Sequence, residues 1–215
     1  MRLGNLRRHG FVLALALAWA GPVDGNLQNL LPPLVAARNA GRAGEVTGSV
    51  VAEPKSPRGV PTPLPGAALV LVPRSPELLR DLEQVKARAR ESEAGYLGAA
   101  AEVSRLRDRF EQALVDSGAG ELVFPGASDA GGRFVLSRVP AGEWLLLGHY
   151  ETVHRPRGSH PSPRERRNFR LGPEPAGYRA VTYWLVSVKV AEGDVVNVEL
   201  TGRNLWLRGV VQEYE

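Results

Sequence analysis

The residues of this chain that could do chemistry are few and lie far apart in the sequence. Six arginines crowd one segment and form a candidate anion-binding site: Arg155, Arg157, Arg164, Arg166, Arg167 and Arg170. Such a cluster attracts lipid headgroups or acidic glycans. The alternative is a solvated surface loop that binds no ligand. Trp206 and Tyr214, close to the C-terminus, are candidate glycan contacts because exposed aromatic rings offer an apolar face with a polar edge.

No catalytic constellation is recognisable. The sequence has no cysteine, which excludes thiolate metal sites and a cysteine nucleophile. His149, His154 and His160 occur in no H-x-x-E or H-E-x-x-H arrangement, so we expect strand-end and loop residues rather than a zinc site. No G-x-S-x-G, P-loop or dinucleotide motif is present. We therefore expect a non-enzymatic protein without cofactor or metal; a hydrolase whose site has no sequence motif is the alternative.

The first 20 residues have the three parts of an export signal. Arg2, Arg7 and Arg8 precede the apolar run 11–18, and small residues flank a predicted cleavage site after Ala20. The run has about half of the roughly 20 residues that a bilayer span requires. We expect cleavage, no transmembrane segment afterwards, and a secreted or periplasmic protein; a retained anchor is the alternative.

The charge of the chain does not favour nucleic-acid binding. The sequence has 27 Lys and Arg against 23 Asp and Glu, a net charge of +4. Removal of Arg2, Arg7 and Arg8 with the signal leaves 24 basic against 23 acidic residues, a net charge of +1. Nucleic acid is bound through a broad basic field, which the cleaved chain lacks. The expected partner is an envelope protein or a polysaccharide.

Residues 45–215 have the pattern of a mainly β fold. Short β-branched and alternating runs, punctuated by many of the 24 glycines and 17 prolines, predict about seven strands. Residues 54–65 contain five prolines and are expected to form a loop, and a short strand at 122–124 is expected to end at Pro125. The fold class that follows is a seven-stranded antiparallel Greek-key β-sandwich.

Residues 76–117 interrupt the strands with a helical pattern. Ser75 and Pro76 suit a helix start, and apolar residues recur at alternating spacings of four and three from Leu78 to Ala113. The insertion is one long helix or a hairpin broken near Gly95 and Gly98, and the hairpin is favoured because it returns the chain to its starting point. The apolar stripe could also join two copies in a homo-oligomer.

The chain is therefore divided into a signal peptide at 1–20, an N-terminal linker at 21–44 and one sandwich domain at 45–215. The domain contains the helical insertion at 76–117 and a basic, proline-rich loop at 154–177.

Four short motifs follow one another along the predicted strands. They are V-T-G-S-V at 46–50, P-L-P-G-A-A-L-V-L at 63–71, S-D-A-G-G-R-F-V-L at 128–136 and V-P-A-G-E-W-L-L at 139–146. The last two follow the pattern D-x-x-G-x-F…P-x-G-x-Y-x-L, with Trp144 in place of tyrosine. This order resembles the carboxypeptidase regulatory-like domain, a transthyretin-like, carbohydrate-binding-like β-sandwich of exported bacterial proteins. The resemblance covers 45–74 and 122–201.

The resemblance implies a structural role for the motif residues: Gly48, Pro65, Gly66, Asp129, Gly132, Phe134, Pro140, Gly142 and Trp144. Domains of this family commonly serve as accessory modules, and the catalytic domain that gives the family its name is absent from this sequence. We therefore expect a non-catalytic binding or structural module of the bacterial envelope or the extracellular space. A carbohydrate-binding module is the alternative within the binding class.

Overall fold

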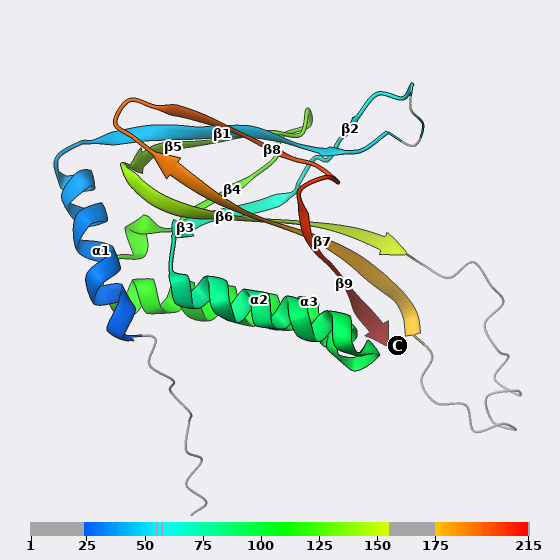
Figure 1. Cartoon of the computed structure of the whole chain (residues 1–215). Helices are drawn as coiled ribbons and strands as arrows, with labels where there is room; N and C mark the ends of the chain where they lie inside the picture. The colour runs from blue at the N-terminus through cyan, green and yellow to red at the C-terminus, as the bar shows by residue number, and fades with distance from the viewer. Residues whose placement is uncertain (1–23, 55, 57, 155–174, 215) are drawn as a thin grey trace, which may run out of the picture.

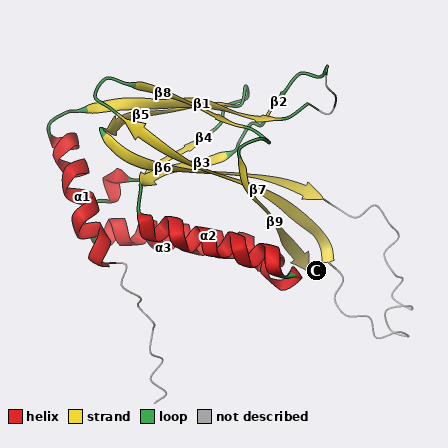
Figure 2. Ribbon diagram, in the orientation of Figure 1, coloured by secondary structure: helices red, strands yellow, loops and turns green. Residues whose placement is uncertain are grey.

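Two β-sheets and a helical hairpin are stacked in three layers (Figures 1 and 2). The computed structural model describes residues 24–54, 56, 58–154 and 175–214. The helices are α1 (Asp24–Asn39), α2 (Pro76–Glu91) and α3 (Glu93–Asp116), followed by the 3₁₀ turn η1 (Gly120–Leu122). The strands are β1 (Ala43–Ala52), β2 (Thr62–Pro63), β3 (Ala68–Pro73), β4 (Phe124–Ala127), β5 (Arg133–Pro140), β6 (Gly142–His154), β7 (Pro175–Val190), β8 (Val195–Leu200) and β9 (Leu205–Tyr214). The predicted signal peptide and most of the predicted basic loop lie outside the described residues.

The strands form a four-stranded and a five-stranded sheet. In the first sheet, β1 pairs with β5 antiparallel, with β8 parallel and with the short β2 at its end. In the second, the order is β4-β3-β6-β7-β9 and every pair is antiparallel. The prediction of a mainly β protein with two facing sheets is confirmed. The described residues form nine strands rather than seven, one pair is parallel, and the Greek-key connection is not confirmed.

Proline explains two of the differences: β2 lies in the segment 54–65 that was predicted as a loop, and the short strand predicted at 122–124 is displaced to β4. Pro63 lies in β2 and Pro125 lies inside β4, where the sequence predicted a strand end. Both strands lie at the edge of their sheets, where the missing proline N–H breaks no ladder bond.

The second sheet is buried on both faces. Side chains of Leu69–Val72 in β3 and Trp144–Leu147 in β6 are each at most 8% exposed. Since successive side chains of a strand point to opposite faces, four buried residues in a row require a layer on each side. The first sheet provides one layer and the hairpin of α2 and α3 provides the other (Figure 2).

The helical insertion is a hairpin, but it turns at Ser92 rather than at Gly95 or Gly98. Ser92 has extended backbone angles, ends α2, and accepts the N–H of Gly95 with its Oγ at 3.0 Å to begin α3. Gly95 has a different role. A Cβ there would lie 2.2 Å from the carbonyl oxygen of Arg88, so glycine permits the two helices to approach closely.

The apolar stripe of the hairpin lies in the core of its own chain. Its buried residues are Leu78, Leu82, Val85 and Ala89 in α2, and Ala99, Ala100, Val103, Leu106, Phe110 and Leu114 in α3. The stripe predicted to join two copies is therefore covered within one chain, and the driving force for that interface is used internally.

The segment predicted to be an N-terminal linker contains a packed helix instead. Leu27, Leu31 and Leu34 are at most 9% exposed and lie on one face of α1. Pro32 and Pro33 suggested a break because an interior proline costs a helix one hydrogen bond. Both prolines are exposed, while the leucine face of the helix is buried against the core. This burial compensates for the lost hydrogen bond.

The motif residues form the turns that join the sandwich strands. The Asp129 carboxylate accepts the N–H groups of Gly131 and Arg133, both at 2.8 Å, while Gly132 has a φ of 74°. The bond from Arg133 is the main reason that the pKa of Asp129 lies below its usual 3.8. At the next turn, the fully buried Trp144 donates its Nε1–H to the carbonyl of Pro140 at 2.8 Å.

Gly48 and Gly98 give a matched test of this packing. A Cβ at Gly48 would lie 1.9 Å from the backbone oxygen of Val198, so Gly48→Ala separates β1 from β8. We expect it to lower the free energy of unfolding by about 2–4 kcal/mol. Gly98 lies in α3 with open space around it, and Gly98→Ala is expected to raise stability by about 0.5–1 kcal/mol. Urea unfolding measures both; equal effects would contradict the β1–β8 pairing.

Candidate functional site

The structure describes only part of the site predicted from the sequence. The six arginines at 155–170 lie outside the described residues, as does the side chain of Tyr214. Trp206 is half-buried against α2 instead of standing free. Its Nε1–H donates to the Glu83 carboxylate at 2.7 Å, and the Lys86 Nζ lies 5.5 Å from its ring centroid. It is the extra residue of a bulge in β9, which points its ring toward the helix.

A groove opens at the end of the sandwich where β1 and β8 both finish. We call it the mouth groove. It has a volume of about 420 Å³ and is lined by Val51, Ala52, Glu53, Leu64, Thr182, Trp184, Gly202, Arg203, Leu205 and Arg208. The lining comes from both sheets and from the turn between β8 and β9. Its volume falls within the range of small-ligand sites.

The turn beside the mouth groove is fixed by side-chain hydrogen bonds. Asn204 accepts the N–H of Thr201 at 2.8 Å and donates to the Glu199 carbonyl at 2.6 Å, and Thr201 Oγ1 accepts the N–H of Arg203 at 3.1 Å. Trp184 of β7 also donates its indole N–H to the Thr201 carbonyl at 2.7 Å. The backbone that carries Arg203 is thus held in place before any ligand arrives.

The mouth groove carries more positive than negative charge. Arg203 and Arg208 line it together with one acid, Glu53. The Arg203 Nε lies 3.4 Å from the Glu53 carboxylate, and the two side chains are 88% and 39% exposed. Arg208 is exposed and makes no ion pair or side-chain hydrogen bond with any residue that the structure describes. Its guanidinium is therefore available to an anionic ligand.

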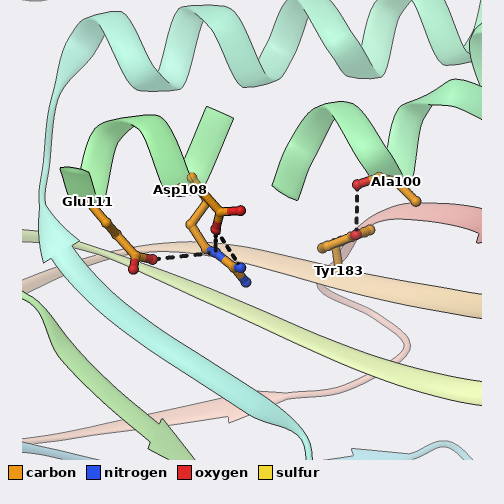
Figure 3. Close-up of polar contacts among 5 residues, drawn as sticks. Ala100, Asp108, Glu111 and Tyr183 are labelled. Carbon is orange, nitrogen blue, oxygen red and sulfur yellow. Dashed lines mark hydrogen bonds and ion pairs between the residues drawn. The ribbon is translucent and has the colours of Figure 1, made fainter. Parts of the chain in front are cut away.

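A second polar cluster lies between the hairpin and the second sheet. Arg107 of α3 contacts Asp108 at 2.7 Å and Glu111 at 3.4 Å, and Tyr183 of β7 donates its hydroxyl to the Ala100 carbonyl at 3.2 Å (Figure 3). The rings of Tyr183 and His149 are 6.0 Å apart. Sequence reasoning missed Arg107 and Tyr183 because they come from an α-helix and a strand that meet only in the fold.

Burial shifts the pKa values in this cluster. Loss of solvation raises the pKa of Glu111 above 4.5, against the lowering effect of Arg107. Loss of solvation also lowers the pKa of His149 below 6.5, and Arg107 adds to that lowering while Glu151 opposes it. The pKa of Tyr183 is raised by burial. The cavity that Arg107, His149 and Tyr183 line is only about 40 Å³, enough for a few water molecules but not for a substrate.

A further groove of about 780 Å³ lies between α1 and the end of α3. Leu27, Leu31 and Val35 form its apolar wall, while Asp116 and Glu121 stand at its rim. Glu121 is already bonded to Arg38. This groove resembles an ordinary helix junction more than a built site, because its polar groups do not converge on one point.

Two further findings bear on chemistry. Among the described residues, no group of three or more His, Asp or Glu side chains is arranged to hold a metal ion. None of the helices in the described part of the chain is long and apolar enough to cross a membrane.

Comparison with known proteins identifies no family for this chain. No family model matches it, and no curated protein matches it. One similar solved structure is a proposed carbohydrate-binding protein from Pseudomonas aeruginosa, at 13% identity, with 74% of this chain and 88% of that chain covered and a TM-score of 0.41. Two structures of the pilus backbone protein of Streptococcus pneumoniae are similar at 14% and 13% identity, with TM-scores of 0.24 and 0.25.

The pilus alignments cover 72% and 79% of this chain but only 40% and 29% of the pilus chains. Likeness at these identities and TM-scores assigns neither a family nor a ligand. The resemblance to the carboxypeptidase regulatory-like domain stays a prediction, and the site has to be judged on its own geometry.

The buried histidine predicts how stability depends on pH. Because the folded pKa of His149 lies below 6.5, the unfolded chain takes up a proton first as the pH falls through 6.5. The stability that neutral His149 contributes is present above pH 6.5 and is lost on acidification toward its folded pKa. Glu111 acts oppositely, contributing most below pH 4.5 and losing that contribution as the pH rises through its raised pKa.

We expect His149→Gln to flatten the fall in unfolding free energy between pH 7.5 and 5.5, measured by urea titration at each pH. Glu111→Gln is the control, since the pKa of Glu111 is shifted in the opposite sense and its removal should not flatten that fall. An identical slope in the wild type and His149→Gln would show that His149 is not desolvated in the fold.

Proposed function

We propose that this protein is a non-catalytic binding module of the carboxypeptidase regulatory-like type, exported to the periplasm or the cell exterior, and that it binds a saccharide in the mouth groove. The observation that carries the proposal is the groove itself. It combines a ligand-sized volume, a rigid turn, and polar groups on an apolar floor, which is the composition of small-ligand sites.

The side chains of the groove suit a sugar. Thr182 and the two arginines offer hydroxyl and guanidinium groups that donate to ring and hydroxyl oxygens. Leu64, Leu205 and the edge of Trp184 supply apolar contact for the C–H face of a sugar ring. Trp184 is only 2% exposed, so it forms the floor of the site and not a stacking platform.

Export is supported by residues 1–20, which combine a basic start, an apolar run and small residues at a cleavage point. The non-catalytic assignment is supported by the position of the titratable groups. His149 and Tyr183, whose pKa values are shifted, line the small cavity under the hairpin, and neither of them nor Glu111 lines the mouth groove.

The test is a substitution that fills the groove without changing its charge. Ala52 lies in the groove wall and is partly exposed, so Ala52→Phe should occupy ligand space and weaken saccharide binding by about tenfold or more. Binding is measured by calorimetry against a panel of neutral and acidic oligosaccharides.

Val135→Phe is the matched control, because Val135 is 59% exposed on the outer face of β5 and does not line the groove. It should leave affinity unchanged. Equal affinity in the Ala52→Phe variant, with its melting temperature preserved, would place the saccharide elsewhere. Absence of binding across the panel would overturn the proposal.

A further inference from the structure

The carboxylate of Glu53 lies beside Arg203 in the mouth groove, in the position that the carboxylate of a ligand would take. Glu53 follows β1, and its side chain crosses to the turn between β8 and β9, where its carboxylate meets the Nε of Arg203 at 3.4 Å. Gly202 makes this crossing possible, since a Cβ at that position would lie 2.8 Å from Cγ of Glu53. The absence of a side chain at residue 202 thus leaves room for the stem of Glu53 over the turn.

The Glu53–Arg203 contact is easy to replace. Arg203 is 88% exposed and Glu53 is 39% exposed, so water screens the pair and its net stabilisation is small. The 3.4 Å distance is also longer than the usual 2.7–2.9 Å of a strong guanidinium–carboxylate hydrogen bond. An incoming carboxylate that forms a two-point contact with the guanidinium would gain more than the internal pair loses.

Arg208 supplies the second half of the site. It lies on β9, lines the same groove, and has no acidic partner among the described residues. Arg208 is thus a second guanidinium at the groove, and unlike Arg203 it is unpaired within the described part of the chain. This favours a ligand with negative charge, because an anionic group would be attracted to Arg208 and a neutral ligand would not.

We propose that the ligand of the mouth groove is an acidic saccharide, a uronate-bearing glycan, whose carboxylate replaces Glu53 at Arg203 while Arg208 holds a second anionic or hydroxyl group. In the free protein Glu53 then occupies the place of the ligand carboxylate. It competes with the ligand for Arg203 and so lowers the affinity of the site. This inference rests on the proposed function, since it names the class of saccharide that the groove takes.

The probes are oligogalacturonate and its methyl ester, which differ in charge but share the same sugar backbone. We expect calorimetry at low salt to give about tenfold or more tighter binding of the acid, a difference that shrinks as salt rises. Inorganic phosphate and sulfate are further probes, which separate recognition of a uronate from recognition of any free anion.

Three substitutions test the roles of the groove residues. Arg208→Gln should weaken binding of the acid by about tenfold and weaken binding of the methyl ester by less. Glu53→Gln should strengthen binding of the acid by about three- to tenfold, because a competing carboxylate is removed. Gly202→Ala should act in the same direction, since it pushes the Glu53 stem off the turn without changing any charge.

The controls carry the same charge changes away from the groove. Lys189→Gln lies at the far end of β7 and Glu192→Gln in the turn before β8, and both residues are exposed. Neither substitution should change the affinity by more than about twofold. A general effect of the protein's net charge would change the affinity by more than that. A gain of affinity in Glu192→Gln equal to that in Glu53→Gln would overturn the role of Glu53.

The two proposals fail differently. Equal binding of the acid and its ester, unchanged by Arg208→Gln but lost in Ala52→Phe, overturns the acidic ligand and leaves the saccharide site in place. Tighter binding of phosphate or sulfate than of the uronate overturns the glycan and retains an anion site. Absence of binding by any probe, together with unshifted Arg203 and Arg208 Nε–H resonances on adding millimolar glucuronate, overturns both.

Discussion

The structure depends on the burial of both faces of the five-stranded sheet. Its central strands β3 and β6 carry apolar residues at every position of Leu69–Val72 and Trp144–Leu147, so neither face can be left in water without a large hydrophobic penalty. One face is covered by the four-stranded sheet and the other by the helical hairpin. The hairpin is therefore a third layer of the core that the sandwich needs, and its amphipathic stripe is consumed in that contact.

Successive side chains of a strand point to opposite faces, so strand β7 contributes residues to both faces of this sheet. Thr182 and Trp184 point toward the four-stranded sheet and line the mouth groove, while Tyr183 between them reaches the hairpin and donates to the Ala100 carbonyl. The shifted pKa values of His149, Glu111 and Tyr183 belong to the hairpin side, where the cavity measures only about 40 Å³. The groove side has the larger volume, about 420 Å³, and the exposed charges of Glu53, Arg203 and Arg208, so the two sites lie on opposite faces of one strand.

The mouth groove itself is a consequence of the parallel pairing of β1 and β8. These strands are aligned from Glu45 with Val195 to Val50 with Leu200, so both run toward the same end of the sheet. The residues that follow them, Glu53 on one side and Gly202 and Arg203 on the other, then meet there. In an antiparallel pair they would leave from opposite ends, and the contact between the Glu53 carboxylate and Arg203 could not form.

Local chemistry in the sequence determined the turns, the alternation of the strands and the existence of the hairpin. Asp129 with Gly132, Pro140 with Gly142, and Ser75 with Pro76 each act within a few residues, so their effect is readable from spacing alone. The tertiary structure alone decided the parallel β1–β8 pair, the packing of α1 and the position of the hairpin turn. The paired residues of β1 and β8 are about 150 positions apart, and the backbone hydrogen bonds that join them leave no local pattern. The groove depends on that pairing, which is why sequence reasoning selected the aromatic and arginine clusters and overlooked Glu53, Arg203 and Arg208.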